Sequence, residues 1–253
     1  MKGTWTLTKT YPPAVLEAFS SLGKVFSLKE GEVVSQDSIC TVTKLKIDNH
    51  EFYIKRYKEA GKGLRKYIGR SRCRAEWENL QICQQLKINT PKIVAYGEES
   101  WLFNFNEPRH AVLITEAVEN AVDLEKMMGE HPEFFAHPAW RKKVSNILAD
   151  YIGRLHKYDF IHRDFKARNI LISKEFDHPK VYFFDMPAGD QVSFVKLTHG
   201  LKKDLFLLDR SIGNKVSRSE KLRFYLVYKI IPRLTKEEKK FIRGVYGFYK
   251  RKS

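Results

Sequence analysis

One stretch of the chain decides the fold: His162-Arg163-Asp164-Phe165-Lys166-Ala167-Arg168-Asn169-Ile170-Leu171. Before it, apolar side chains in 141–157 recur with the spacing i, i+3, i+4, i+7, which predicts a helix buried on one face. After it, residues 171–173 and 181–184 have the composition of short strands joined by a turn at 177–179. A polar loop between a long helix and a strand is held at both ends, as a catalytic loop must be.

Four residues of this stretch have the spacing H-R-D-x-x-x-x-N, which resembles the catalytic loop of kinases. Asp185 stands sixteen residues after Asn169, at the end of an apolar run, where those enzymes place a second metal ligand. Four fixed positions coincide by chance in roughly one window in 10⁵–10⁶. The competing interpretation is a surface loop whose charges are accidental.

Phosphoryl transfer explains why these residue types are needed. Mg²⁺ prefers carboxylate and amide oxygens together with phosphate oxygens, so Asn169 and Asp185 are predicted to bind Mg²⁺ and position the phosphates of ATP. Asp164 is predicted to orient the acceptor hydroxyl and accept its proton, and Lys166 to reach the transferred phosphoryl group as a cation. We therefore assign catalytic roles to Asp164, Lys166 and Asn169.

The first 116 residues are rich in strand patterns. A hairpin is expected over 41–57 with its turn at 48–50, followed by a helix over 72–86 and strands at 91–96 and 110–115. Lys55 lies in F-Y-I-K, which resembles the V-A-I-K of kinases, and is the candidate lysine for the α/β-phosphates. Glu76, 21 residues later, is its candidate partner. The alternatives are that Lys55 is an ordinary edge-strand lysine, and that Glu78 is the partner.

Over most of its length the chain resembles lipopolysaccharide core kinases of the Kdo/WaaP/InaA type, a bacterial branch of the protein-kinase-like fold. The resemblance is carried by Tyr53-Ile54-Lys55, Ala75-Glu76-Trp77-Glu78-Asn79-Leu80, Ile114-Thr115-Glu116, the H-R-D loop, Phe183-Phe184-Asp185-Met186-Pro187-Ala188-Gly189 and 204–211. It implies an α+β, bilobal protein-kinase-like fold forming one unit. A small β-rich N-lobe with one main helix would span 1–116, and a larger, mostly helical C-lobe 117–253.

The resemblance also implies roles and an activity. Nucleotide contacts are expected from the hinge around Glu116 to Val118, and Asp204 is expected to accept main-chain hydrogen bonds from the catalytic loop. The implied reaction is ATP-dependent phosphorylation of a sugar hydroxyl, of heptose or Kdo, in the lipid A-linked core saccharide. The implied location is the cytoplasmic side of the bacterial inner membrane.

Two departures separate the chain from ordinary protein kinases. No G-x-G-x-x-G precedes Lys55, so a less glycine-dependent turn within 31–42 must cover the phosphates. Asp185 begins D-M-P-A-G, and only 18 residues separate it from Asp204, with no A-P-E, which disfavours a peptide acceptor. The rival functions are an atypical protein or small-molecule kinase of the same fold and a catalytically silent, membrane-docked binding module.

Charge is unevenly distributed along the chain. Lys and Arg number 46 against 30 Asp and Glu, a formal net charge of +16, and residues 215–253 alone carry 13 basic and three acidic residues. Two helices are expected there, because Ser217 with Glu220 and Thr235 with Glu238 have the spacing of capping boxes. Basic, aromatic-rich helices suit an anionic membrane surface, although they could equally cap the second lobe with solvated lysines.

A second basic stretch comprises Lys62, Arg65, Lys66, Arg70, Arg72 and Arg74, and would either meet anionic groups of the saccharide or solvate a loop. Nucleic-acid binding is not expected, because no recognised module accompanies these charges. The N-terminus lacks the apolar stretch of a signal peptide and no run of 18 apolar residues occurs, so a cytoplasmic, peripheral protein is expected. Three cysteines without C-x-x-C spacing support neither a disulfide framework nor a zinc site.

Overall fold

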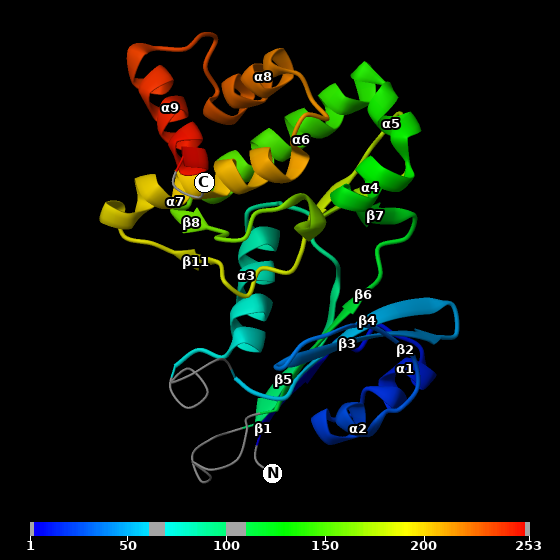
Figure 1. The fold of residues 1–253 in the computed structure, drawn as a ribbon. Coiled ribbons are helices and arrows are strands. Elements are labelled where there is room, and N and C mark those ends of the chain that lie inside the picture. The colour runs from blue at the N-terminus through cyan, green and yellow to red at the C-terminus, as the bar shows by residue number, and fades with distance from the viewer. Residues whose placement is uncertain (1–2, 61–68, 100–109, 251–253) are drawn as a thin grey trace. The chain divides into compact units, whose positions relative to one another are not determined.

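The computed structural model describes residues 3–60, 69–99 and 110–250 (Figure 1). The chain divides into two compact units, Met1–Gln81 with Pro91–Val118, and Ile82–Thr90 with Glu119–Ser253. The assignment of these units to a nucleotide-covering lobe and a catalytic lobe stays a prediction.

The first unit is built on a six-stranded antiparallel sheet in the order β1-β5-β6-β4-β3-β2. Its strands are β1 (Gly3–Leu7), β2 (Glu32–Gln36), β3 (Cys40–Ile47), β4 (His50–Tyr57), β5 (Ile93–Glu99) and β6 (Ala111–Glu116). The predicted hairpin is confirmed as β3 and β4, which pair from Cys40↔Tyr57 to Ile47↔His50. The two later predicted strands are confirmed as β5 and β6.

Strand alternation sorts the side chains of β4 onto two faces. Phe52 and Ile54 are fully buried in a core that two short helices cover, α1 (Pro13–Ala18) and α2 (Leu22–Ser27). Arg56 follows on the same face, and its guanidinium donates to the main-chain oxygen of Val25 at 2.9 Å. Lys55 therefore points to the opposite face of the sheet, toward the helix α3.

Helix α3 (Arg72–Gln85) confirms the helix predicted over 72–86. The Ser71 hydroxyl caps its first turn by accepting from Arg74 N at 3.0 Å, and donates to Glu98 Oε2 of β5 at 2.6 Å. Trp77 of α3 stacks on Tyr96 of β5, with ring centroids 4.2 Å apart. These contacts fix which face of α3 meets the sheet, and therefore where its acidic residues point.

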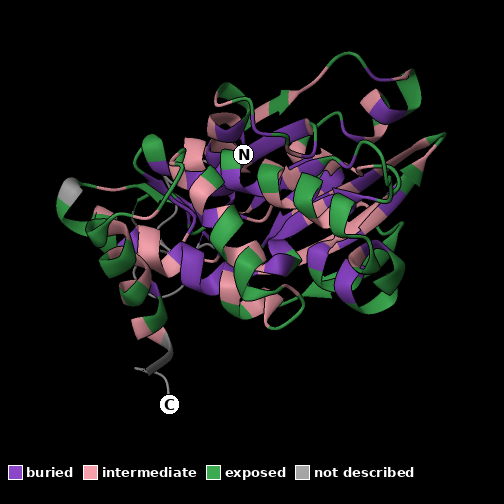
Figure 2. Cartoon of the chain, turned by 90° about the horizontal axis from the view of Figure 1, so that it is seen from above, coloured by how far each residue is buried: buried purple, intermediate pink, exposed green. Residues whose placement is uncertain are grey.

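The second unit is mostly helical. Its helices are α4 (Leu124–Glu130), α5 (Pro132–Ala136), α6 (Pro138–Lys157), α7 (Phe194–Ile212), α8 (Arg218–Lys229) and α9 (Lys236–Lys250). Its strands are β7 (Ala121–Asp123), β8 (Phe160–Ile161), β9 (Ile170–Ser173), β10 (Val181–Phe183) and β11 (Asp190–Gln191). Helix α6 buries Val144, Leu148, Ile152 and Leu155 on one face, as its spacing predicted, and Figure 2 shows buried and exposed residues alternating along the helices.

The two predicted C-terminal helices are present; the expected capping box is complete at α8, and at α9 only its Thr235 half is formed. At α8, Ser217 and Glu220 form a complete capping box, and Arg141 donates to Glu220 at 2.8 Å. Burial opposes ionisation of Glu220, but the hydrogen bonds from Ser217 and the charge of Arg141 outweigh it and lower the pKa to about 2. At α9, Glu238 N donates to Thr235 Oγ1 at 3.2 Å. Within the part of the chain that the structure describes, no helix is both long and apolar enough to cross a membrane.

Candidate active site

The H-R-D loop is anchored by a buried carboxylate on α7. Asp204, 1% exposed, accepts hydrogen bonds from His162 N at 2.7 Å and from Arg163 N at 2.8 Å. This confirms the support expected from Asp204. Because each carboxylate oxygen takes one main-chain donor, the loop is fixed in both position and direction as it leaves β8.

Helix α7 holds the loop at two further points. Gly200 lets the helix approach β8, since a Cβ at this position would lie 2.6 Å from Ile161 Cγ1. Beyond the loop, Ser211 Oγ accepts from Ala167 N at 2.9 Å, at the start of the short 3₁₀ turn Ala167–Asn169. The H-R-D loop is thus fastened to one helix before and after Asp164.

Two non-glycine residues of this region have left-handed backbone conformations, Arg163 with φ 68° and Asp185 with φ 53°. Such conformations cost free energy and gather at functional sites, where the surroundings hold them in place. His162 is 1% exposed, and its ring lies edge-on to Phe165. Burial lowers the pKa of His162 against the pull of Asp204 and Asp185, and neither ring nitrogen has a hydrogen-bond partner among the described residues.

The Asp164 carboxylate lies between two basic side chains. Its Oδ1 lies 2.5 Å from Lys166 Nζ and its Oδ2 lies 3.6 Å from Arg168. Burial raises the pKa of the Asp164 carboxyl, but the hydrogen bond and charge of Lys166, with Arg168 and Asn169, outweigh it and hold the pKa below its usual range. The carboxylate is therefore ionised at neutral pH, as its predicted role of proton acceptor requires.

Asn169 and Asp185 occupy neighbouring positions at the ends of paired strands. Ile170 of β9 pairs with Phe183 of β10, and one step further Phe184 N donates to the main-chain oxygen of Asn169 at 3.3 Å. The Asn169 amide nitrogen donates to the Asp164 main-chain oxygen at 2.8 Å, so the bond fixes the orientation of the amide. Among the described residues no three His, Cys, Asp or Glu side chains gather as a metal-binding group.

In the first unit, the pairing of Lys55 with Glu76 is present. Lys55 Nζ lies 2.5 Å from Glu76 Oε1, and the Tyr57 hydroxyl donates to Glu76 Oε2 at 2.6 Å. Glu76 is 2% exposed and Lys55 14% exposed, so the ion pair is shielded from water yet its cation is within reach of solvent. Its role toward a nucleotide stays a prediction.

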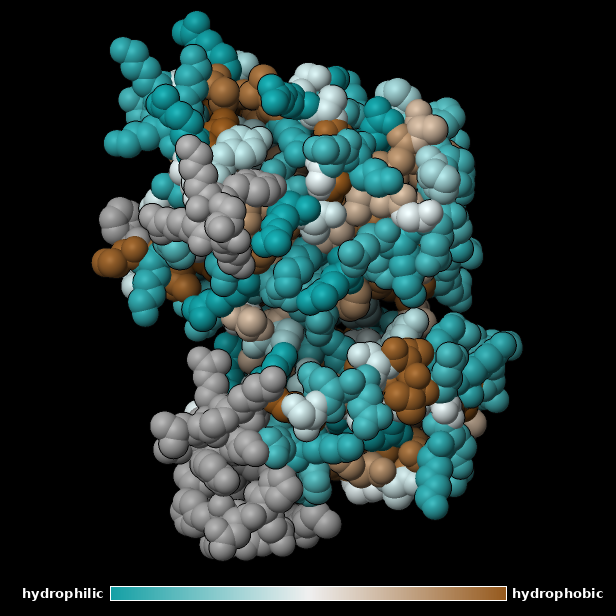
Figure 3. Space-filling view, viewed as in Figure 1, coloured by the Kyte–Doolittle hydropathy of each residue, from teal (hydrophilic) through white to brown (hydrophobic). Residues whose placement is uncertain are grey.

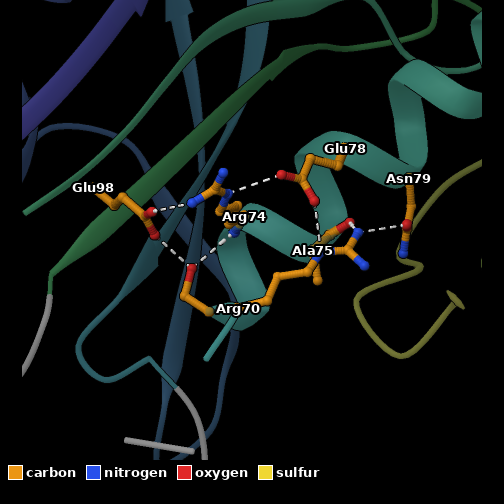
Figure 4. Close-up of polar contacts among 7 residues, drawn as sticks. Arg70, Arg74, Ala75, Glu78, Asn79 and Glu98 are labelled. Carbon is orange, nitrogen blue, oxygen red and sulfur yellow. Dashed lines mark hydrogen bonds and ion pairs between the residues drawn. The ribbon is translucent and has the colours of Figure 1, made fainter. Parts of the chain in front are cut away.

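Glu78, the alternative partner, is engaged elsewhere (Figure 4). Arg70 Nε lies 2.7 Å from Glu78 Oε2, and Arg74 Nε lies 2.8 Å from Glu78 Oε1. Arg70 also donates to the main-chain oxygen of Ala75 at 3.0 Å and to Asn79 Oδ1 at 2.7 Å. Arg70 and Arg74 of the second basic stretch therefore brace α3, while Lys62, Arg65 and Lys66 lie outside the described residues.

Glu116 ends β6 with its side chain turned into the first unit. Its carboxylate accepts from Tyr11 at 2.8 Å, lies 2.9 Å from His50 Nδ1 and 3.8 Å from Lys92 Nζ. Burial opposes ionisation, but these three partners outweigh it and lower the pKa of Glu116. The Glu116 side chain is therefore engaged within the first unit, and the nucleotide contacts expected from the hinge around Glu116 to Val118 stay a prediction.

The turn between β2 and β3, within the 31–42 segment predicted to cover the phosphates, is shaped by an aspartate rather than by glycines, and its role toward phosphates stays a prediction. Asp37 N donates to the Cys40 main-chain oxygen at 2.9 Å, and Asp37 Oδ1 accepts from Ile39 N and Cys40 N at 2.7 and 2.6 Å. Such side-chain bonds shape a tight turn without requiring glycine. The signal in the sequence was the aspartate itself, because Asp side chains favour turns by bonding main-chain N–H groups two or three residues on.

The family model of the lipopolysaccharide kinase (Kdo/WaaP) family matches residues 36–228, which is more than half of the chain. The chain belongs to this family. A solved structure described as WaaP in complex with acyl carrier protein aligns with a TM-score of 0.75, covering 98% of this chain and 97% of that chain at 20% identity. That likeness confirms the predicted α+β, kinase-like fold of this Kdo/WaaP family member. None of the curated proteins matches its sequence.

Proposed function

We propose that this chain transfers the γ-phosphoryl group of ATP to a hydroxyl of heptose or Kdo in the inner core of lipopolysaccharide. The observation that carries the proposal is Asp164, which is ionised, partly exposed and flanked by Lys166 on a loop that Asp204 anchors. A carboxylate in such a position orients a hydroxyl for in-line attack and accepts its proton as the bond to phosphorus forms. Membership of a lipopolysaccharide kinase family supports the acceptor class.

Lys166 is assigned the role of stabilising the negative charge of the phosphoryl group during transfer. In the structure it pairs with Asp164, with side chains 34% and 37% exposed, so its ammonium group can turn to an incoming phosphoryl group. Preorganised cations of this kind lower the barrier because no solvent has to reorganise around the developing charge. Lys55, held by Glu76, is assigned to the α- and β-phosphates of ATP.

Asn169 and Asp185 fit a magnesium ion. Their amide and carboxylate oxygens are hard donors, and they come from adjacent positions on the paired ends of β9 and β10. Mg²⁺ is commonly bound by one or two carboxylates together with substrate phosphates and water, rather than by an all-protein cage. When bound, the ion neutralises phosphate charge, while Asn169 keeps its link to the Asp164 backbone.

The short connection after Asp185 favours a sugar over a peptide. Residues 186–193 lead directly to α7, and within them β11 is only Asp190–Gln191, paired with β8. A peptide-binding activation segment needs more chain than this. The basic helices α8 and α9 support peripheral attachment to the anionic, cytoplasmic face of the inner membrane, where a lipid A-linked saccharide would be available.

The proposal is tested by phosphate transfer from labelled ATP with Mg²⁺. The acceptors are purified lipopolysaccharide that lacks core phosphate and a generic protein, and the enzymes are the wild-type chain, Asp164→Ala and the exposed control Asp150→Ala. Label in the saccharide alone, lost only in Asp164→Ala, supports the proposal. Label in protein alone would show that the acceptor is a protein rather than a sugar. ATP binding without phosphate transfer would favour the catalytically silent binding module.

Acyl carrier protein is a further candidate partner, because WaaP has been solved in complex with it. The second unit contains a cavity of about 960 Å³, lined mainly by apolar side chains of α6 to α9 that include Leu148, Leu205, Leu208, Leu226 and Val245. This size lies within the roughly 300–1,000 Å³ typical of small-molecule pockets. We propose that it buries the acyl chain of a loaded carrier protein.

Thermal unfolding with acylated and unacylated carrier protein tests this second partner. The acylated form is expected to raise the unfolding midpoint of the wild-type chain, because a ligand that binds only the folded state stabilises it. Leu208→Trp, which narrows the cavity, is expected to reduce the difference between the two forms. Equal shifts from both forms with the wild-type chain would contradict the proposal.

A further inference from the structure

The turn between α8 and α9 displays an isoleucine in an unfavourable position. Ile230 is the C-cap of α8, with φ 54° and ψ 48°, in the left-handed region. Its side chain is 91% exposed, ahead of Val195 at 87% among the large apolar side chains of the described residues. Two further apolar residues of α8, Leu222 and Val227, are 41% and 37% exposed.

An isoleucine at this position is unusual in two respects, its backbone conformation and its exposure. Helices that end in a left-handed residue usually place glycine or asparagine there, because a branched Cβ crowds the backbone in that conformation. Turns at the surface are also normally polar. Ile230 therefore adds backbone strain and exposed apolar surface to the folded protein while burying almost nothing. Such a side chain gains free energy only when something other than this chain covers it.

The segment that contains Ile230 is strongly basic. Between Ser217 and Lys240 the exposed charged side chains are six cations and one anion, Glu237; the cations are Arg218, Arg223, Arg233, Lys236, Lys239 and Lys240. The other two acidic residues of the segment are already paired, Glu220 with Arg141 and Glu238 with Lys229. Figure 3 shows hydrophobic surface set among hydrophilic side chains over α8 and α9.

We infer that the α8–α9 turn docks on an anionic lipid bilayer, with Ile230 entering the boundary between headgroups and acyl chains. The flanking lysines and arginines meet the lipid phosphates, and their apolar stems extend along the interface. A bilayer fits better than a protein groove, because a single projecting apolar side chain in a segment rich in long, exposed cations suits a fluid, anionic medium rather than a shaped pocket. The inference rests on the proposed function in that the acceptor is a membrane-bound glycolipid.

The test is co-sedimentation of the full chain with vesicles of phosphatidylcholine alone and of phosphatidylcholine with phosphatidylglycerol. Ile230→Gly is expected to weaken binding to the anionic vesicles by about ten- to a hundred-fold, the loss that corresponds to one fully buried isoleucine. The same variant is expected to unfold at the same or a higher temperature, because glycine tolerates φ 54° without strain. These opposite signs separate lost docking from lost folding.

Two matched variants complete the design. Val195→Ser removes an equally exposed apolar residue at the start of α7 and is expected to leave vesicle binding unchanged. Lys236→Glu with Lys240→Glu is expected to remove the preference for anionic vesicles, and added salt to weaken wild-type binding in the same direction. Phosphate transfer to a soluble, delipidated core saccharide is measured beside these, and Ile230→Gly is expected to retain it.

Three results would overturn the inference. One is that Ile230→Gly binds anionic vesicles as strongly as the wild-type chain does. Another is that the wild-type chain binds neutral and anionic vesicles equally. The third is weaker binding of Ile230→Gly to acyl carrier protein with unchanged binding to vesicles, which would assign the turn to a protein partner. Failure of phosphate transfer in the wild-type chain alone would overturn the proposed function and leave the vesicle result standing.

Discussion

Asp204→Asn changes one atom at the point where the catalytic loop is fastened. The aspartate accepts from His162 N at 2.7 Å and from Arg163 N at 2.8 Å, one bond to each oxygen. An asparagine has the same shape, but its amide nitrogen cannot accept a hydrogen bond. One buried main-chain N–H is therefore left facing another donor, and the remaining bond loses its charge.

The magnitude follows from these two bonds. A hydrogen bond to a charged group contributes about 1.5–3 kcal/mol, and a buried donor left without a partner costs about 1–3 kcal/mol. We expect Asp204→Asn to lower the free energy of unfolding by about 2–4 kcal/mol. For a chain of this size, this corresponds to a fall of roughly 5–15 °C in the unfolding midpoint.

Stability and activity are measured together. Urea unfolding gives the free energy, and phosphate transfer below the unfolding temperature is expected to fall further than stability explains, because Arg163 and Asp164 lose their fixed geometry. Asp150→Asn, which removes an exposed i,i+4 pair with Arg154, is the control and is expected to change stability by less than about 0.5 kcal/mol. Unchanged stability and activity in Asp204→Asn would refute the anchoring role.

Three further changes test other parts of the account. Lys55→Met is expected to lower kcat/KM for ATP by about 10²–10³, because Glu76 loses its cation and the phosphates lose theirs; wild-type kinetics would contradict the assignment. The folded pKa of Glu220, about 2, lies below the ordinary 4.5, so its carboxylate stabilises the fold above about pH 5 and that contribution is lost as the pH falls toward 2. Allowing for solvent screening, we expect this carboxylate to contribute about 1–2 kcal/mol to the free energy of unfolding. Urea unfolding measured at several pH values should show this loss in the wild-type chain and not in Glu220→Gln, and parallel pH profiles for the two proteins would contradict it. Gly200→Ala places a methyl group 2.6 Å from Ile161 Cγ1 and is expected to cost about 1–3 kcal/mol in a thermal scan, where an unchanged midpoint would contradict the close packing.

The parts of the fold that the sequence predicted are those encoded locally. The β3–β4 hairpin follows from alternation around a turn, and helices α3, α6, α8 and α9 follow from apolar spacing and caps. The proximity of Asn169 and Asp185 was also predictable, because Asn169 precedes β9 and Asp185 follows β10, the next strand along the chain; their role as metal ligands stays a prediction. Each of these features depends on residues close together in the chain.

The parts that were missed depend on distant contacts. β1 pairs with β5, some 90 residues later in the chain, and the alternation around Trp5 and Leu7 was its only local signal. Helices α1 and α2 have six residues each, too short for periodicity, and are held by burial of Val15, Phe19 and Val25 against the sheet. Helices α4 and α5 are similarly short.

Side-chain direction was the other limit. The sequence indicated Glu116 at the hinge, but only the fold shows its carboxylate turned to Tyr11 and His50. Similarly, Glu76 and Glu78 lie on one helix, and the choice between them depends on which face of α3 meets the sheet. Those contacts are tertiary, so the sequence spacing favoured Glu76 as the partner of Lys55 but could not exclude Glu78.

The central claim is that this chain phosphorylates a sugar of the lipopolysaccharide core. The most direct measurement is mass spectrometry of the core saccharide, released by mild acid after dephosphorylated lipopolysaccharide has been incubated with ATP, Mg²⁺ and the chain. The account predicts a gain of one phosphate on heptose or Kdo with the wild-type chain and none with Asp164→Ala. An unchanged saccharide mass while ATP is consumed, or the same gain with Asp164→Ala, would contradict it.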